Sequence, residues 1–384
     1  MQVGWQLNIL TSGVFQAGAH VNQNSYMEKS RSFVTRHRNV LVFMGGFLFD
    51  FVTMIRIDSW TDLGIQLFYL SGITFLLVYQ YREVRGVWTP PALVARLWHY
   101  NIEILHFFYG GLLSAYVVLY LKSSSGARPI VFFLLLAALM GINEMPMIRR
   151  FGHRLRLGLF AFCVASFLIY FVPIILGFMG WFTFVLSLAG AGYLVWKIAG
   201  LLASTEDDRK AVQMRLFRPA AAVLIVILAL YALRLIPPVP LSVQYEGIYH
   251  RVEREDGHYA LSTPKPPLYL FWKRDSRPFR AQPGDQVFFF VRVFAPARFR
   301  HQVMIRWEMK LEKSGKYVTT DRIPLQVTGG RSKGYRGFAI KSHFETGHWR
   351  VSTETEDGRT ISVLPFRVVP DTSTKERTWR VTQM

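Results

Sequence analysis

Cysteine is almost absent from this sequence, because Cys163 is the only one among 384 residues. A single cysteine excludes an intrachain disulfide and a cysteine-rich zinc site. The sequence also has no G-x-S-x-G nucleophile elbow, no P-loop, no H-E-x-x-H pair and no dinucleotide-binding fingerprint. The histidines after residue 240 are scattered, without metal-ligand spacing. We therefore expect no cofactor and no metal site, and the sequence favours a protein that is not an enzyme.

Charged residues are also scarce. They make up 18% of the chain, whereas soluble domains have roughly 25%. Residues 1–26 contain no charged side chain at all, although a secretory signal would begin with a basic region. Residues 27–38 are basic and typical of a cytoplasmic lead-in to a membrane span. We interpret 1–38 as a cytoplasmic segment, with Met27 as a hypothetical translation start.

Long apolar runs occupy most of the chain between residues 39 and 236. A helix rises about 1.5 Å per residue, so about 20 apolar residues cross a hydrocarbon core. Only helices and closed barrels satisfy their backbone groups in lipid. Pro237 and Pro238 are expected to stop the last helix, because proline has no N–H donor. The sequence predicts seven transmembrane helices, at 39–55, 63–79, 102–121, 129–147, 157–176, 182–202 and 220–236.

The connections between these spans differ in charge. Those on one side carry 16 Lys and Arg, and those on the other carry three. Basic connections stay in the cytoplasm, so the N-terminus is expected to be cytoplasmic and everything after residue 236 extracytoplasmic. In a bacterial inner membrane, the C-terminal part then lies in the periplasm. This part has 25 Lys and Arg against 15 Asp and Glu.

Ionisable residues occur inside the third and fourth predicted spans. His99, Glu103 and His106 follow helical spacing, which predicts one shared face. A tight hairpin would place Asn143 and Glu144 opposite them. Such groups are costly in lipid and usually paired. This cluster could be a structural pair, a proton relay or a metal site, and the metal reading lacks the second Glu-x-x-His motif that it needs.

After residue 240 the apolar period changes from helical to alternating. In residues 302–310, QVMIRWEMK, every second side chain is apolar, which is typical of a half-buried strand. Seven similar runs, at 242–249, 268–272, 287–294, 317–327, 334–341, 348–355 and 360–369, are separated by Gly- and Asp-rich turns. The sequence predicts a Pro-rich linker at 237–240, an all-β, immunoglobulin-like antiparallel sandwich at 241–370 and a flexible tail at 371–384.

Several turns and aromatics in this part agree in order with a known family. They are FFFVRVFAPARF at 288–299, IRW at 305–307, IP at 323–324, GGR at 329–331, GYRG at 334–337, GHWRV at 347–351, DGR at 357–359 and FRV at 366–368. On these residues, the stretch 287–369 resembles the domain-of-unknown-function family numbered 2914. The membrane part resembles the multi-span domain of unknown function 5924 that accompanies it. Neither resemblance implies a reaction.

The run GGRSKGYRG, at 329–337, combines glycines with donors. Glycines allow tight turns, and an arginine on such a turn suits bidentate recognition of phosphate or carboxylate. The alternative is that these cations are solvated or structural. The ligand-binding candidates are Arg331, Lys333, Tyr335, Arg336 and Arg350.

Two functions are compatible with the sequence. The first is a non-enzymatic envelope protein, whose basic periplasmic sandwich binds an anionic polymer, a lipid head group or a periplasmic protein. The second is a membrane-embedded enzyme or transporter that uses the His/Glu cluster. Membrane lipid is an expected partner of both. Nucleic acid is not, because the positive charge is either exported or explained by membrane topology.

Overall fold

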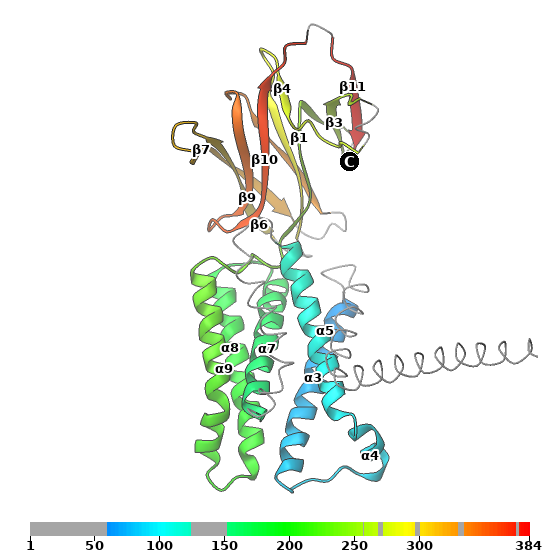
Figure 1. Cartoon of the computed structure of the whole chain (residues 1–384), viewed down its shortest axis with the longest axis vertical. Helices are drawn as coiled ribbons and strands as arrows, with labels where there is room; N and C mark the ends of the chain where they lie inside the picture. Colours follow the sequence, from blue (N-terminus) through cyan, green and yellow to red (C-terminus); the bar gives the residue numbers. More distant parts are fainter. Residues whose placement is uncertain are drawn as a thin grey trace, which may run out of the picture.

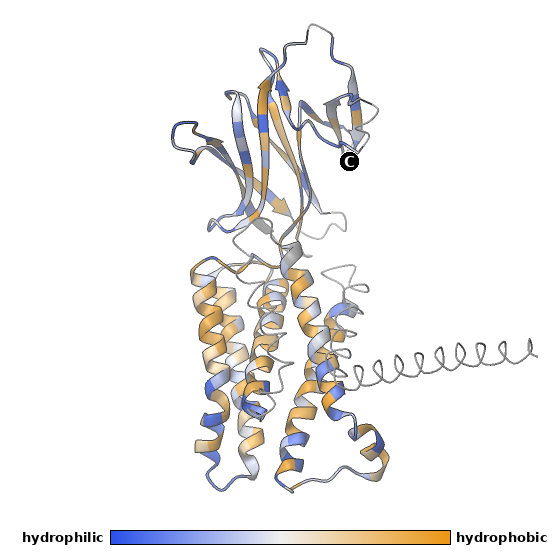
Figure 2. Cartoon of the chain, viewed as in Figure 1, coloured by the Kyte–Doolittle hydropathy of each residue, from blue (hydrophilic) through white to orange (hydrophobic). Residues whose placement is uncertain are grey.

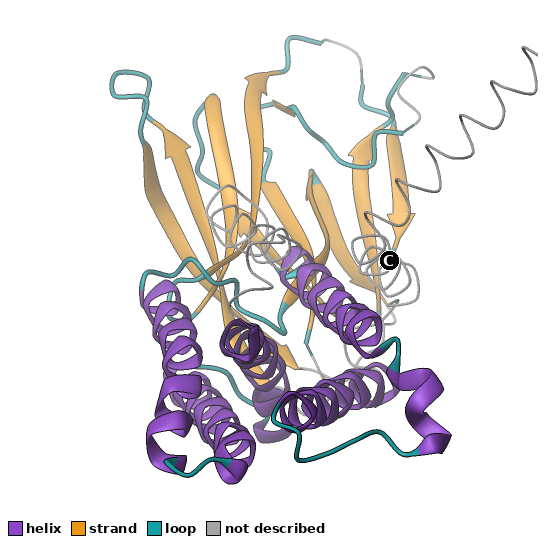
Figure 3. Cartoon of the chain, turned by 60° about the horizontal axis from the view of Figure 1, so that its bottom comes forward, coloured by secondary structure: helices purple, strands orange, loops and turns teal. Residues whose placement is uncertain are grey.

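The computed structural model describes residues 60–123, 152–255, 257–267, 272–295, 300–328, 334–373 and 376–384. It has a helical N-terminal part followed by a β-rich C-terminal part, as the sequence predicts (Figure 1). In Figure 3, which brings the helical end forward, the helices lie in front of the strands. The predicted spans 39–55 and 129–147 lie outside the described residues.

The described helices follow the predicted apolar runs. Four of them are long and apolar enough to cross a membrane, and their lengths are mostly coloured as hydrophobic in Figure 2. These are α3 (Trp60–Val84), α7 (Gly152–Leu176), α8 (Trp181–Leu202) and α9 (Arg209–Ala232). The others are α4 (Ala92–Trp98), α5 (Asn101–Lys122) and the 3-10 helix η2 (Ala203–Thr205). Several large apolar side chains on these helices are exposed, among them Phe68 and Ile225 at 62% and 65%, and contiguous apolar surface marks a site of contact with a membrane or with another protein.

The last helix ends four residues earlier than the sequence predicts, and not at the prolines. Arg234 adopts a left-handed conformation with φ 58°. The Leu235 N–H donates to the Leu230 carbonyl and the Arg234 N–H to the Tyr231 carbonyl. This pair of bonds is a Schellman motif, which satisfies the last carbonyls of a helix. Arg234 is therefore the residue that ends α9.

Polar contacts tie the helices together at the end of the bundle that carries α4, away from the strands (Figure 1). Arg85, just after α3, forms a 2.6 Å ion pair with Glu206 between α8 and α9. Arg156, in the first turns of α7, donates to the Gln80 side chain at 2.8 Å. The basic stretches at 82–96, 152–156 and 197–218 thus meet at this one end.

The β-rich part contains three sheets. One has the order β1-β5-β8, the second β4-β10-β9-β6-β7 and the third β11-β3-β2. Neighbouring strands are antiparallel, except that β4 runs parallel to β10. The bounds are β1 (Ser242–Tyr249), β2 (Arg251–Glu255), β3 (His258–Pro264), β4 (Phe279–Ala281), β5 (Val287–Phe294), β6 (Arg300–Lys310), β7 (Tyr317–Thr328), β8 (Tyr335–Lys341), β9 (Gly347–Thr355), β10 (Thr360–Pro370) and β11 (Trp379–Gln383).

The first two sheets, β1-β5-β8 and β4-β10-β9-β6-β7, share one hydrophobic core. Alternate residues of β6, including Val303, Ile305 and Trp307, are fully buried, as strand geometry requires for a half-buried sheet. The Trp307 ring lies edge-on to Phe289 of the opposite sheet, with centroids 6.3 Å apart. Edge-to-face aromatic pairs of this kind add about 1 kcal/mol beyond area burial.

The third sheet uses a segment that the sequence predicts to be a flexible tail. Residues Trp379–Gln383 form β11, which pairs with β3 from Trp379 opposite Pro264 to Gln383 opposite Ala260. These five residues lie inside the predicted tail at 371–384. The sequence does not reveal that β3 pairs with this segment, and β3 supplies the backbone hydrogen bonds that hold β11 in place.

The connection between the helical and β-rich parts is packed rather than extended. Val239 and Leu241 are 4% and 1% exposed. Met179, between α7 and α8, packs against the core of the two sheets, and Phe294 of β5 belongs to the core of the helices. The Arg359 side chain, 4% exposed, reaches from the turn between β9 and β10 to the end of α9. The position of the β-rich part on the bundle is therefore fixed by direct contacts.

Candidate functional site

A pocket opens at the edge of the two sheets that share the hydrophobic core, where β1 faces β10. Its volume is about 710 Å³, within the usual range of ligand sites, about 300–1,000 Å³. We call this site the edge pocket. Its lining residues are Tyr245 and Glu246 of β1, Pro365 of β10, and Trp272, Lys273, Arg274, Asp275, Arg277 and Pro278 of the connection before β4.

The connection that forms one wall is held by its own polar groups. Asp275, 8% exposed, accepts from the Arg277 Nε at 2.5 Å and from the Arg277 backbone N–H at 3.3 Å. Ser276 donates its backbone N–H to the Ile248 carbonyl at 2.7 Å. These bonds place the wall against β1, so the side chains on either side of Asp275 and Ser276 face the pocket in a defined arrangement.

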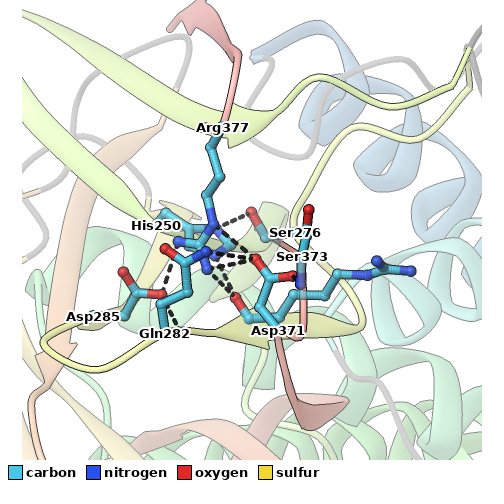
Figure 4. A network of polar contacts seen from close by, with 8 residues as sticks. His250, Ser276, Gln282, Asp285, Asp371, Ser373 and Arg377 are labelled. Carbon is cyan, nitrogen blue, oxygen red and sulfur yellow. Dashed lines mark hydrogen bonds and ion pairs between the residues drawn. The ribbon is translucent and has the colours of Figure 1, made fainter. Parts of the chain in front are cut away.

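His250 supports this wall from behind (Figure 4). Its Nδ1 lies 3.0 Å from the Ser276 hydroxyl and its Nε2 lies 3.0 Å from the Arg280 carbonyl. A carbonyl only accepts, so Nε2 carries the proton and Nδ1 accepts from Ser276. The imidazole stacks on Phe279, with ring centroids 4.1 Å apart. Burial lowers the pKa of His250 below its usual value, and nearby Arg377 acts in the same direction.

A second set of bonds in Figure 4 fixes the chain near His250. Arg377 pairs with Asp285 at 2.8 Å and with Asp371 at 3.0 Å. Gln282 donates its backbone N–H to Asp285 at 2.8 Å and its side-chain amide to Asp371 at 3.2 Å. These residues come from segments far apart in sequence, and their contacts hold the start of β11 against the turn after β4.

Glu246 is the acidic group of the opposite wall. It is partly buried and accepts a hydrogen bond from the Ser362 hydroxyl of β10. Burial raises the pKa of Glu246, although the bond from Ser362 and the charge of Arg277 act against that rise. The contact links the two sheets at their open edge and leaves a carboxylate at the pocket.

Three cations and an indole complete the lining. Arg277 is engaged with Asp275, but the side chains of Lys273 and Arg274 form no hydrogen bond or ion pair with the described residues. Burial is the largest cause that lowers the pKa of Lys273, and Arg280, Arg277 and Arg380 add to it. Trp272 is 62% exposed. Uncompensated cations beside an exposed aromatic suit an anionic ligand with an apolar face.

The arginines predicted to bind a ligand are held by the protein instead, where the structure describes them. Arg350 of β9 forms a bidentate pair with Glu308 of β6 at 2.6 and 3.0 Å, and its guanidinium lies 4.2 Å from the Tyr317 ring centroid. Arg336 of β8 donates to the Gly257 carbonyl at 3.2 Å. Tyr335, also of β8, packs against the core of the two sheets. Arg331 and Lys333 lie outside the described residues.

The predicted His/Glu face does not extend to His99. This residue caps the end of α4, and Tyr100 is non-helical before α5 begins at Asn101. Helical spacing does not hold across this break, and the His99 side chain is exposed. Glu103 and His106 do lie on one face of α5, each 9% exposed. Asn143 and Glu144 lie outside the described residues.

No group of three or more His, Cys, Asp or Glu side chains within the described ranges could hold a metal ion. The edge pocket was not predicted from the sequence. Residues 268–271 of the predicted strand 268–272 lie outside the described residues, and Trp272 lies in a turn. The available signal was the run WKRDSRP at 272–278, in which an aromatic and three cations surround one acid. Such a composition is unusual for a buried strand, in which charges are rare.

Comparisons with known proteins identify one family. Residues 300–368 match the model of a family described as "Protein of unknown function (DUF2914)", which confirms the first resemblance over that stretch. No curated protein matches the chain. Among solved structures, Pseudomonas fluorescens alkylpurine DNA glycosylase AlkC bound to DNA containing an abasic site analog is 11% identical, with coverage of 79% of this chain and 98% of that chain. Its TM-score of 0.19 is too low to carry an argument about fold or function.

Proposed function

We propose that this chain is a non-enzymatic protein of the bacterial inner membrane that binds an anionic envelope ligand in the edge pocket. Seven transmembrane helices anchor it with a cytoplasmic N-terminus, and the β-rich part is an immunoglobulin-like sandwich in the periplasm. The N-terminal part belongs to the multi-span class that the sequence resembles. The single observation that carries the binding role is the pair Lys273 and Arg274, which line the pocket and whose side chains form no hydrogen bond or ion pair with the described residues.

The orientation is supported by the distribution of charge over the two ends of the bundle. Basic connections gather at the end that carries α4, as the contacts of Arg85 and Arg156 indicate. The β-rich part lies at the other end (Figure 1). Basic connections remain on the cytoplasmic side, so the edge pocket faces the outside of the cell membrane.

The binding role is supported by a contrast between cations that bond to the protein and cations that line the pocket without such bonds. Arg350 and Arg336 neutralise or cover groups of the protein, and they stabilise the fold. The side chains of Lys273 and Arg274 form no hydrogen bond or ion pair with the described residues, although the charge of Asp275 acts on Lys273. Arg274 is exposed, so its guanidinium is open to a ligand. The neighbours of these two cations, Trp272 and Asp275, give the pocket both an apolar and a polar wall.

The test uses the full-length protein in nanodiscs of neutral lipid. Three anionic probes are titrated over a salt series: inorganic phosphate, phosphatidylglycerol vesicles and oligogalacturonate. Saturable binding of at least one probe, weaker at higher salt through screening, is expected. The Lys273→Gln/Arg274→Gln protein should lose that binding, and Arg251→Gln, an exposed arginine of β2, should keep it. Binding that is equal in both variants, or absent for all probes, contradicts the proposal.

A further inference from the structure

We propose that the ligand of the edge pocket is a saccharide that carries a carboxylate, an acidic sugar unit. This inference rests on the proposed function and narrows its ligand to one chemical class. It follows from three features of the lining: an exposed indole, two carboxylates, and a small excess of positive charge.

The indole provides a surface for a sugar ring. Trp272 is 62% exposed at the pocket, and an indole presents a large, flat apolar face. Tyr245, Pro278 and Pro365 extend the apolar surface around it. One face of a pyranose presents C–H groups and fits a flat apolar wall, whereas a phosphate ion gains nothing from such a wall.

The carboxylates argue against a densely charged ligand. Glu246 and Asp275 both line the pocket. A carboxylate accepts hydrogen bonds from hydroxyl groups, and a sugar has several hydroxyls to donate. The same carboxylates repel a phosphate or sulfate group that lies near them. A pocket for a plain inorganic anion would not have two acids in its lining.

The net charge of the pocket lining fits a ligand with one acid group on each sugar unit. Lys273, Arg274 and Arg277 face two carboxylates, so the lining carries one positive charge more than it carries negative charge. Arg277 is already paired with Asp275 at 2.5 Å. Lys273 and Arg274 remain, and the guanidinium of Arg274 can bind a carboxylate bidentately. A sugar acid supplies this carboxylate together with hydroxyls that can donate to Glu246.

The pocket has the size and openness that such a ligand needs. Its volume of about 710 Å³ exceeds what one small anion fills, and it lies on the sheet edge, where no described strand covers it. The wall that carries Trp272 and Arg274 is braced by Ser276 and His250. A braced wall loses little conformational freedom when the ligand binds.

The experiment compares two ligands that differ only in charge. Full-length protein in neutral nanodiscs is titrated by calorimetry with oligogalacturonate and with its methyl ester, which keeps the rings and hydroxyls but removes the negative charge. We expect the acid to bind about 10-fold or more tightly than the ester, which corresponds to one charge-assisted pair.

Substitutions at two exposed residues test separately whether the ligand is a sugar that lies on Trp272 and whether its carboxylate binds Arg274. Trp272→Ala and Arg274→Gln should each weaken oligogalacturonate binding about 10-fold, and neither side chain is part of the core, so the protein still folds. Arg251→Gln serves as the matched control, because it removes an exposed arginine outside the pocket.

The outcomes separate this inference from the function on which it rests. If phosphate or phosphatidylglycerol binds through Lys273 and Arg274 while oligogalacturonate does not, the acidic sugar is wrong and the anion-binding function stands. If Trp272→Ala leaves the affinity for oligogalacturonate unchanged, the acidic sugar is also wrong and the anion-binding function stands. If no anionic probe binds, both proposals are wrong.

Discussion

The guanidinium of Arg359 lies 3.5 Å from the ring centroid of Tyr231, and it thereby joins the turn between β9 and β10 to the last turn of α9. Arg359 also donates to the Tyr231 carbonyl at 3.2 Å and pairs with Asp357 at 2.7 Å. The Tyr231 ring stacks in turn on Phe184 of α8, with centroids 3.5 Å apart. The stack of Phe184, Tyr231 and Arg359 fixes the edge pocket relative to the helical bundle.

The first prediction concerns this junction. Arg359→Gln removes a desolvated cation–π contact worth about 2 kcal/mol, which should lower the Tm by roughly 4–8 °C. It should also expose the connection at 237–240 to protease. Arg367→Gln, an exposed arginine on β10, is the control and should change neither. An unchanged Tm together with an unchanged cleavage pattern in Arg359→Gln would show that the junction does not depend on Arg359.

The second prediction concerns the ion pair across β6 and β9. Glu308 is 4% exposed and receives two hydrogen bonds from Arg350. Arg350→Leu leaves this carboxylate with Arg306 at 3.7 Å as its remaining charged partner. We expect a loss of about 2 kcal/mol in the free energy of unfolding, because hydrogen bonds to charged groups contribute about 1.5–3 kcal/mol.

The double variant Arg350→Leu/Glu308→Leu should recover part of that loss, since removal of both partners leaves no unpaired buried charge. Thermal unfolding of the three proteins measures both effects. If Arg350→Leu binds anionic probes less well while its stability is unchanged, Arg350 is a ligand-binding residue, as the sequence suggested, and the structural role is wrong.

The third prediction is a pH dependence of stability. Burial lowers the pKa of His250 below its usual 6.5, Arg377 adds to this, and Asp285, Asp371 and the Arg280 carbonyl oppose it. The unfolded chain therefore binds a proton at a higher pH than the folded one. Stability should be constant above about pH 6.5 and should fall from there towards the lowered pKa.

The measurement is the Tm of the full chain at about pH 7.5 and about pH 5.5. His250→Gln should be less stable at the higher pH but should show a smaller decline between the two. His343→Gln replaces an exposed histidine and should decline as the native protein does. An equal decline in all three proteins would assign the pH dependence to other groups.

The fourth prediction concerns ligand binding at alkaline pH. Burial and the three neighbouring arginines lower the pKa of Lys273 from its usual 10.5, and Asp275 partly offsets this. Lys273 thus loses its charge at a lower pH than an exposed lysine, so affinity for an anionic probe should fall early as pH rises. Lys273→Arg keeps its charge, because the guanidinium pKa exceeds about 12, and should bind with a flatter pH profile.

Arg274→Gln is the control for this series. It binds more weakly at every pH but retains Lys273, so its affinity should show the same relative decline as that of the native protein. A flat profile in the native protein would mean that Lys273 does not contact the ligand.

Much of the fold could be predicted from the sequence. The strands β1 and β5 begin and end at the predicted residues, because their β-branched and aromatic composition leaves little alternative. The helical part and its apolar runs were equally clear. Four strands were not predicted. Two of them depend on a distant partner: β11, which pairs with β3, and β4, which pairs with β10. The other two, β2 and β3, pair with each other as a local hairpin.

The candidate site was less accessible from the sequence. Arginines on a Gly-rich turn and on a strand looked available for a ligand, but Arg350 meets Glu308, 42 residues away, and Arg336 meets Gly257, 79 residues away. Whether a cation is engaged depends on such tertiary contacts. His99 was placed on a helix that breaks at Tyr100, where no glycine or proline marks the end.

The measurement that tests the central claim most directly is the exposure of the edge pocket on the outside of the membrane. Cys163 is the only cysteine and is fully buried, so Arg274→Cys in a Cys163→Ser background gives one reactive thiol. It is treated with a membrane-impermeant maleimide in intact spheroplasts. The account predicts labelling without permeabilisation, while Arg96→Cys on α4 is labelled only after it. Labelling of Arg274→Cys that requires permeabilisation would contradict the account.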